Sequence, residues 1–367
     1  MKIGILGAGQ LGRMMVLEGM PLGLDFVLYD PAGKPSANVG EILVPDNGSD
    51  VLQEFLSKVD VVTYEFEHLP LDQVRIIAEQ KPVYPGVEAL RVCQHRALEK
   101  ALFDELKIPT APYRIADSEE ALAQAVRELG TPVVAKSVTE GYDGKGQAVI
   151  RSPEEAGSAW ARIGHEQVLV EKFVQFEREV SIVAVRSRDG EVRTWPMGEN
   201  LHQDGILRLT RAPAPGLSEA TQKAADDYIT RILNRLDYVG VLALELFETS
   251  EGLLANEMAP RVHNSGHWTQ NGAAISQFEN HIRAVAGLPL GATHATAHTC
   301  MINLIGELPD ISGVLSHPDA HLHLYGKSPR AGRKLGHINV VNDDADALEN
   351  ATEALLRQLS ADHSLRQ

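Results

Sequence analysis

The sequence predicts a multidomain protein of mixed α/β and α+β class. Residues 1–94 alternate apolar strand patterns with helix patterns, which is typical of a parallel sheet covered by helices on both faces. From residue 131 onward, closely spaced apolar stretches separated by turns favour antiparallel pairing. Because a chain of 367 residues is too long for one ordinary core, two or three packed domains are expected.

Composition and charge limit the classes of partner. The chain is 44% hydrophobic and 23% charged, as in soluble globular proteins, and no apolar stretch approaches the ~20 residues of a membrane span. A formal net charge of −16 disfavours nucleic acids and anionic membranes, which need a basic surface. The first strand begins directly at Met1, so we expect no signal peptide and a cytoplasmic location. Cys93 and Cys300 are expected to be reduced, buried thiols.

The N-terminal part, residues 1–94, opens with GILGAGQLG between a strand and a helix. Gly7, Gly9 and Gly12 have the spacing of the glycine fingerprint of Rossmann domains, and Asp30 ends the next strand, FVLYD. The pattern predicts a Rossmann-like domain with an anion site at a helix N-terminus. An NAD-dependent oxidoreductase is one hypothesis, but it leaves the motifs described below unexplained.

The later parts of the chain are predicted from their strand and turn patterns. After a helix in RALEKALFDELK, strands are expected in TPVVAKSV, GQAVI, QVLVEKFV and EREVSIVAV. The segment YVGVLALELFETSEGLLANEMAP predicts two strands around a turn containing Gly252. From about residue 291, strands in HLHLYGK and GHINVV precede a polar C-terminal helix. The predicted domains are 1–94, 95–290 (with a lid at about 110–175) and 291–367.

The segment TEGYDGKGQAV predicts a phosphate-binding loop. Gly141, Gly144 and Gly146 lie within six residues and allow backbone amides to turn toward an anion. Lys145 lies inside the loop, and Lys136 follows an apolar run in the strand before it, where an ammonium group facing phosphate is a sensible choice. The spacing differs from that of a P-loop. A flexible hairpin with an edge lysine reaching solvent is the alternative.

The glutamates of the hairpin predict a cation site. With a turn centred on Glu251, the opposed residues would be Ala243 with Ala259, Glu245 with Glu257, and Phe247 with Ala255. Carboxylates about 5 Å apart at Cβ destabilise a sheet unless a cation lies between them. Mg²⁺ fits because it takes one or two carboxylates and fills its shell with phosphates and water, and Asn256 would add an oxygen. A register slip that separates both glutamates into solvent is the alternative.

A dense polar cluster follows in APRVHNSGHW. Arg261 offers a planar fork that can hold a small planar oxyanion, and His263 and Asn264 add donors. A structural loop of satisfied polar groups is the alternative.

The combination of GYDGKGQ, VEKFV followed by EREVSIV, NEMAPRVHNSGH and LYGKSPRAGRKLGHI resembles the ATP-grasp enzymes. More closely, it resembles the family of 5-(carboxyamino)imidazole ribonucleotide synthases of purine biosynthesis, over nearly the whole chain. The resemblance implies an ATP-grasp fold with a Rossmann-like pre-ATP-grasp domain and a small C-terminal β-rich domain. It also implies a homodimeric ligase that uses ATP and Mg²⁺ to carboxylate aminoimidazole ribonucleotide with bicarbonate through carboxyphosphate.

The resemblance further implies roles for individual residues. ATP would be bound by Arg96, Lys136, Gly141, Tyr142, Asp143, Gly144, Lys145, Gly146, Gln147, Glu171, Lys172, Phe173, Val174, Glu179, His202, Asn256 and Glu257. The metal ligands would be Glu245 and Glu257. Bicarbonate would be received by Arg261, His263 and Asn264, and Lys327 would join them as a catalytic residue. Aminoimidazole ribonucleotide would contact Gln10, Leu11, Glu67, Tyr142, Asp143, Lys327 and Arg333.

Several alternatives stay open at this stage. Gln10 would otherwise only cap its helix, and Lys327 and Arg333 would form a solvated basic surface. A non-catalytic adenine-nucleotide sensor would keep the same fold. A related formate-using or biotin-carboxylating ligase would keep the same ATP chemistry, and sequence physics alone does not separate it from the favoured hypothesis.

Overall fold

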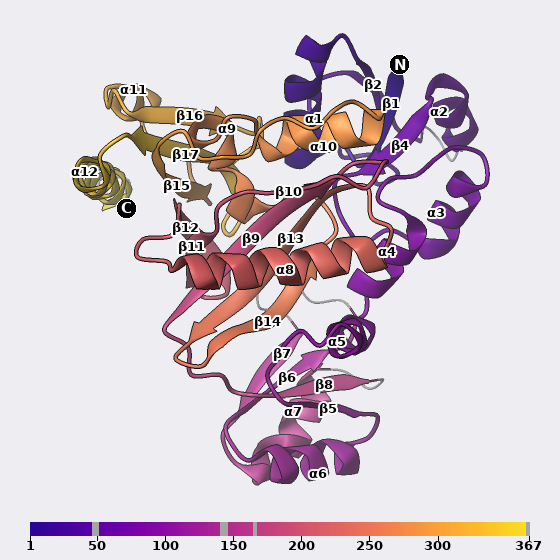
Figure 1. Ribbon diagram of the computed structural model, residues 1–367, viewed down its shortest axis with the longest axis vertical. Helices are drawn as coiled ribbons and strands as arrows, with labels where there is room; N and C mark the ends of the chain where they lie inside the picture. The colour runs from indigo at the N-terminus through magenta and orange to yellow at the C-terminus, as the bar shows by residue number, and fades with distance from the viewer. Residues whose placement is uncertain (46–50, 140–145, 164–166, 365–367) are drawn as a thin grey trace.

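The structure is a computed structural model that describes residues 1–45, 51–139, 146–163 and 167–364 (Figure 1). Within these ranges the chain forms three β-sheets, which we call the N-terminal sheet, the lid sheet and the central sheet. In the same ranges, no helix is both long and apolar enough to cross a membrane.

The N-terminal sheet consists of parallel strands in the order β3-β2-β1-β4, which confirms the predicted parallel arrangement. Its strands are β1 (Lys2–Leu6), β2 (Asp25–Tyr29), β3 (Glu41–Leu43) and β4 (Val61–Tyr64). The helices around it are α1 (Gln10–Gly19), the 3₁₀ turn η1 (Met20–Leu22), α2 (Leu52–Lys58), α3 (Leu71–Ala78) and α4 (Val87–Cys93). The strand β3 and the helices α2 and α4 are not predicted, because their apolar patterns are short.

The lid sheet is antiparallel, in the order β5-β8-β6-β7, as the change of pattern after residue 131 predicts. Helix α5 (Arg96–Glu105) precedes it along the chain. Its strands are β5 (Tyr113–Ala116), β6 (Val133–Ser137), β7 (Gln147–Ile150) and β8 (Val168–Lys172). The apolar sides of α6 (Glu119–Leu129) and α7 (Ala156–Ile163) pack on it, and the 3₁₀ turn η2 (Pro153–Glu155) contacts these two helices.

The central sheet follows the order β14-β13-β9-β11-β12-β15-β17-β16, and β10 pairs with β9. All of its strand pairs are antiparallel. The strands from the middle of the chain are β9 (Arg178–Arg186), β10 (Val192–Thr194), β11 (Gly198–Gln203), β12 (Ile206–Ala212), β13 (Gly240–Thr249) and β14 (Gly252–Ala259). The C-terminal strands are β15 (His298–Ile305), β16 (Ala320–Leu324) and β17 (Lys334–Asn342). Since β15 pairs with β12, the C-terminal strands extend the central sheet.

Alternating side chains cover the two faces of the central sheet with different helices. Ile182 and Leu242 point to the face on which α8 (Glu219–Arg235) packs, while Val183 and Val241 point to the face that meets α10 (Gln277–Ala286). This two-residue period is the expected geometry of strands buried on both faces. The C-terminal strands pack against α12 (Ala345–Ser364), and α11 (Ile311–Leu315) lies beside β16.

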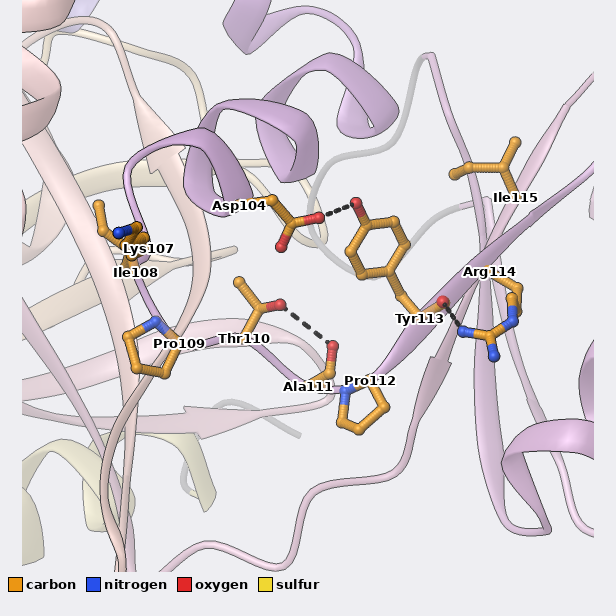
Figure 2. Close-up of a pocket in the computed structure, with 10 residues that line it drawn as sticks. All are labelled: Asp104, Lys107, Ile108, Pro109, Thr110, Ala111, Pro112, Tyr113, Arg114 and Ile115. Carbon is orange, nitrogen blue, oxygen red and sulfur yellow. Dashed lines mark hydrogen bonds between the residues drawn. The ribbon is translucent and has the colours of Figure 1, made fainter.

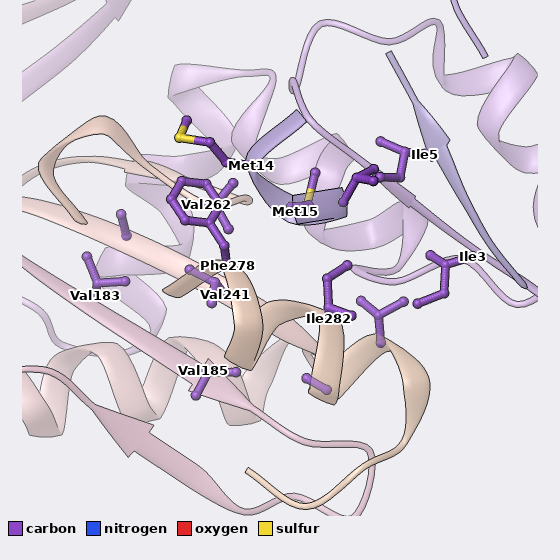
Figure 3. Packing of buried hydrophobic residues seen from close by; sticks show 14 of the residues in the cluster. Ile3, Ile5, Met14, Met15, Val183, Val185, Val241, Val262, Phe278 and Ile282 are labelled. Carbon is purple, nitrogen blue, oxygen red and sulfur yellow. The ribbon is translucent and has the colours of Figure 1, made fainter. Parts of the chain in front are cut away.

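One continuous core joins the N-terminal sheet to the central sheet (Figure 3). Phe278 and Ile282 of α10 lie between Met15 of α1, Ile5 of β1 and the apolar side chains of β9 and β13. All of these side chains are fully buried. The loops at the ends of β1 and β4 are therefore held firmly against the segment that follows β14.

The β13–β14 hairpin confirms two of its three predicted pairings. Glu245 is opposite Glu257, and Ala243 is opposite Ala259. The predicted pairing of Phe247 with Ala255 is wrong.

Two local features explain that error. Thr249 is opposite Gly252, so the turn is centred between residues 250 and 251 rather than on Glu251. This moves every pairing near the turn out of the predicted register. A β-bulge then leaves Asn256 without an opposed residue, which shifts the register back before the two glutamates meet. The bulge thus brings the carboxylates face to face.

Candidate active site

Two cavities meet where the three sheets approach one another. The N-terminal pocket, of about 530 Å³, lies among the glycine loop before α1, the end of β4 and the segments that follow β14 and β16. The central pocket, of about 570 Å³, lies between lid strands β6 and β7 and central strands β13 and β14. The residues that line both pockets are Glu67, His68, Arg261, His263, Asn264 and Lys334. We call these six residues the shared wall, because the two pockets adjoin there.

A third cavity, of about 690 Å³, is lined by Asp104 and residues 107–115, in the link between α5 and β5 (Figure 2). The hydroxyl of Tyr113 donates to the Asp104 carboxylate at 2.7 Å. Since no predicted site residue lines this cavity, we do not assign it to the active site.

The structure brings most of the predicted residues to the first two pockets. Those that line only the central pocket are Arg96, Lys136, Gln147, Phe173, Glu179, His202, Glu245, Asn256 and Glu257. Those that line only the N-terminal pocket are Gln10, Leu11, Lys327 and Arg333. Those that line neither are Gly146, Glu171, Lys172 and Val174. Those that lie outside the described residues are Gly141, Tyr142, Asp143, Gly144 and Lys145.

The paired glutamates have different electrostatic surroundings. Burial and the charge of Glu257 raise the pKa of Glu245 to about 7. Burial acts to raise the pKa of Glu257, but the charges of Arg96 and Lys136 lower it by more. The pKa of Glu257 therefore lies below its ordinary value. Arg96 Nη1 donates to Glu257 Oε2 at 2.7 Å. Glu245 therefore takes up a proton more readily than Glu257, which keeps its charge at neutral pH.

Lys136 pairs with a buried carboxylate on the neighbouring lid strand. Its Nζ lies 2.8 Å from Glu171 Oε2 and 3.3 Å from Asn256 Oδ1. The lysine thus bridges the lid sheet and the β14 bulge. Glu171 also pairs with Lys100 at 2.7 Å. These ion pairs exclude the solvated edge lysine considered from the sequence.

Glu179 and His202 form a second ion pair, between β9 and β11. Burial lowers the pKa of His202, but the hydrogen bond and charge of Glu179 raise it more, and the net shift is upward. Between β8 and β9, the N–H of Lys172 donates to Pro112 O and that of Phe173 to Pro132 O. For the N–H of Val174, no acceptor is found among the described residues.

The shared wall contains the polar cluster that follows β14. Arg261 donates through Nε and Nη2 to the Glu67 carboxylate, with an Nη2–Oε1 distance of 2.9 Å. Arg261 Nη1 also donates to Val262 O at 3.2 Å. Among the described residues this leaves one N–H on each Nη nitrogen for an added oxyanion. Burial acts to raise the pKa of Glu67, but Arg261 brings it down to about 2. The two polar side-chain atoms of Asn264 are buried and have no hydrogen-bond partner among the described residues.

His263 has a defined tautomer in this wall. Its Nδ1 accepts the N–H of Ser265 at 3.3 Å and lies 2.9 Å from the Ser265 hydroxyl. The ring proton is therefore on Nε2, which lies 3.4 Å from Glu245 Oε1. Burial and the charge of Arg261 lower the pKa of His263 to about 3, so the ring is neutral at pH 7.

The glycine loop before α1 binds a carboxylate of the protein itself, that of Glu65. The carboxylate of Glu65, at the end of β4, accepts the N–H of Gly9 and, at 2.7 Å, that of Gly12. A Cβ on Gly7 would lie 2.5 Å from Glu65 Cγ, and one on Gly9 would lie 2.8 Å from Glu65 Oε1. The glycine spacing is therefore used to accommodate Glu65 at the helix N-terminus.

The basic residues of the C-terminal part face the same loop. Lys327 donates to the side-chain oxygen of Gln10, which joins the segment after β16 to the start of α1. Arg333 donates to Ser328, on its own segment, and lines the pocket. Burial lowers the pKa of Lys327. Gln10, Lys327 and Arg333 all line the N-terminal pocket, as the hypothesis of a common phosphorylated ligand requires.

Comparisons with known proteins agree along the whole chain. Residues 1–94 match the ribonucleotide synthetase preATP-grasp domain, residues 101–278 the ATP-grasp domain, and residues 299–351 the phosphoribosylaminoimidazole carboxylase C-terminal domain. An N5-carboxyaminoimidazole ribonucleotide synthase of Pseudomonas aeruginosa is 48% identical over 351 residues, which are 95% of this chain and 97% of that protein. The chain belongs to the N5-carboxyaminoimidazole ribonucleotide synthase family.

Solved structures of this family have the same fold. The synthetase of Thermus thermophilus is 49% identical, covers 98% of both chains and superposes with a TM-score of 0.93. The Aspergillus clavatus synthase, solved in complex with ADP and 5-aminoimidazole ribonucleotide, is 30% identical, covers 98% of both chains and has a TM-score of 0.89. The predicted ATP-grasp fold with its N-terminal domain and C-terminal β-rich region is therefore confirmed, as is membership of this ligase family.

Sequence reasoning misses three buried charged residues at the site. The prediction names Glu67 and not Glu65 in YEFEH, although Glu65 is the one that reaches the glycine loop. Glu99 and Lys100 look like ordinary parts of the α5 pattern, yet Glu99 accepts the N–H of Met258 at 2.7 Å. The available signal is the i, i+3, i+4 spacing of Arg96, Glu99 and Lys100, which places three charges on one helix face.

Proposed function

We propose that this chain catalyses the ATP-dependent carboxylation of 5-aminoimidazole ribonucleotide with bicarbonate, giving N5-carboxyaminoimidazole ribonucleotide, ADP and phosphate. ATP occupies the central pocket, and aminoimidazole ribonucleotide occupies the N-terminal pocket. The observation that carries this assignment is the wall shared by the two pockets, where Arg261, His263 and Asn264 lie. Bicarbonate bound there is within reach of both other substrates.

The residues of the shared wall are suited to a small oxyanion. Asn264 offers a buried amide with no partner among the described residues, which is costly unless a ligand binds it. The neutral His263 offers its Nε2–H, and Arg261 offers the N–H groups that Glu67 and Val262 leave open. These donors orient bicarbonate for attack on the γ-phosphate and then stabilise the charge of carboxyphosphate.

The nucleotide residues act mainly by position and charge. Lys136 and Arg96 neutralise the phosphates, Glu179 binds the ribose hydroxyls, and the backbone N–H of Val174 meets the adenine edge. Phosphoryl transfer requires positioning and charge neutralisation rather than a protein nucleophile. Carboxyphosphate is labile in water, so closure of the lid over the site protects it.

We also propose that Mg²⁺ is held by Glu245 and Glu257. Their opposed carboxylates fit a cation that takes the rest of its shell from phosphates and water. When bound, Mg²⁺ supplies positive charge to the triphosphate.

On the substrate side, Gln10, Leu11, Lys327 and Arg333 bind the phosphorylated end of aminoimidazole ribonucleotide. On the basis of the family, we also propose domain boundaries at residues 94 and 290. We propose a cytoplasmic location and a homodimer on the same basis.

The test is an assay of ADP and phosphate release in which each substrate is omitted in turn. We expect release to require ATP, bicarbonate and aminoimidazole ribonucleotide together. ATP binding without such turnover would support a nucleotide sensor and contradict the proposal. In a variant series, Asn264→Ala is expected to lower kcat and keep ATP binding, whereas Asn350→Ala on the exposed side of α12 is the matched control.

A further inference from the structure

The central pocket is backed by a carboxylate that two lysines share. Lys100 Nζ lies 2.7 Å from Glu171 Oε1, and Lys136 Nζ lies 2.8 Å from Glu171 Oε2. The Lys100 side chain is 1% exposed and that of Glu171 6%, whereas that of Lys136 is 14% exposed and lines the pocket. Only one of the two lysines is therefore able to reach a ligand.

The two lysines are held in different ways. Lys100 also donates to the backbone oxygen of Asn256 at 3.0 Å and lies 3.5 Å from that of Ala255. These carbonyls flank the β14 bulge, so Lys100 is fixed between α5 and β14. Lys136 has instead a 3.3 Å bond to the Asn256 side chain, which is itself at the edge of the pocket.

We propose that Lys100 is a positioning residue that lets Lys136 exchange Glu171 for the phosphates of ATP. The inference rests on the proposed function only in placing ATP in the central pocket. When Lys136 turns to the nucleotide, Glu171 keeps Lys100 as its counter-ion. The exchange therefore leaves Glu171 paired.

The physical reason is the cost of leaving a charge uncompensated away from water. Removing one partner of a buried ion pair is strongly unfavourable, because the other charge stays buried. With Lys100 present, Glu171 loses only one of two partners when ATP binds. Without Lys100, Lys136 would be the one lysine paired with Glu171. Glu171 would then compete directly with the nucleotide phosphates for the Lys136 ammonium group.

The experiment is a calorimetric titration of the full-length protein with ATP and Mg²⁺ for Lys100→Met, Glu171→Gln and the double variant. Lys100→Met is expected to bind ATP about tenfold more weakly, in the range of coupling between buried charges in contact. Glu171→Gln removes the competitor, and since Glu171 lines neither pocket, this variant is expected to bind ATP at least as tightly as the original chain. The double variant is expected to recover most of the affinity lost in Lys100→Met.

This recovery distinguishes positioning from a merely structural role, which would make the double variant no better than Lys100→Met. Thermal unfolding of each variant checks folding, and Lys223→Met on the exposed surface of α8 is the matched control. If Lys100→Met does not fold, Glu171→Gln decides alone, and a tenfold loss of ATP affinity in that variant overturns the inference. Failure of the original chain to bind ATP would instead contradict the proposed function.

Discussion

The clearest structural prediction concerns Glu65, which fills the anion site of the glycine loop. Replacing Glu65 with alanine removes the acceptor of two backbone N–H groups, those of Gly9 and Gly12. A buried donor without an acceptor costs ~1–3 kcal/mol, so the two losses sum to about 2–6 kcal/mol. Relief of the buried carboxylate offsets part of this cost, since burial raises the pKa of Glu65. We expect a net loss of about 2–4 kcal/mol in the free energy of unfolding.

A double-mutant cycle with Gly9→Ala sharpens the test. The added Cβ would lie 2.8 Å from Glu65 Oε1, and the next nearest atoms to that Cβ also belong to Glu65. Because the backbone φ of Gly9 is −99°, alanine is sterically allowed there. Gly9→Ala should therefore cost ~1–3 kcal/mol in the original chain and clearly less beside Glu65→Ala.

The assay is urea-induced unfolding of the four proteins, accompanied by a titration with NADH. We expect a coupling free energy of about 1–2 kcal/mol between the two positions and no NADH binding. Additive effects, or micromolar NADH binding by the original chain, would refute the view that the glycines serve Glu65.

The remaining predictions address the metal pair, the second substrate and the response to pH. Glu257→Gln should lower kcat at least about 100-fold, because it removes a charge that faces the nucleotide, and the variant should still fold; activity close to that of the original chain would exclude the metal assignment. Lys327→Met should raise the KM for aminoimidazole ribonucleotide about tenfold and leave the KM for ATP unchanged, and equal changes in both constants would count against it. Burial lowers the pKa of His281 to about 3. Its Nδ1 accepts the N–H of Val241, and its Nε2 lies 2.8 Å from the Thr63 hydroxyl. As the pH falls, His281 takes up a proton in the unfolded chain before it does so in the folded chain. The free energy of unfolding should therefore fall by ~1.4 kcal/mol per pH unit from about pH 6.5 toward pH 3. His281→Gln should flatten that slope in urea unfolding.

Much of the fold follows from local pattern. Apolar strands that alternate with helices, as around β1 and β4, predict a parallel sheet because both faces must be covered. The three-residue strand β3 and helix α2 have too few residues to show a period. The attachment of β15 to β12 is a long-range pairing. No local pattern in THATAHTC (residues 293–300), where β15 begins, reveals it.

The site shows the same division between local and long-range information. The Glu245–Glu257 pairing is predictable because a hairpin is local, although the bulge at Asn256 that produces it is not. The partners of Lys136 and Arg261 come from residues far away in sequence, and ion pairs of this kind depend on packing. The role of Glu65 escapes sequence reasoning because it depends on how close β4 lies to the loop before α1.

The most direct test of the proposed chemistry follows the oxygen atoms of bicarbonate. Attack of bicarbonate on the γ-phosphate transfers one of its oxygens to phosphorus, and that oxygen stays there when the carbamate forms. With ¹⁸O-labelled bicarbonate, ATP and aminoimidazole ribonucleotide, mass spectrometry should find one ¹⁸O atom in each phosphate released. Phosphate that carries no ¹⁸O while the carboxylated product still forms would contradict a carboxyphosphate route.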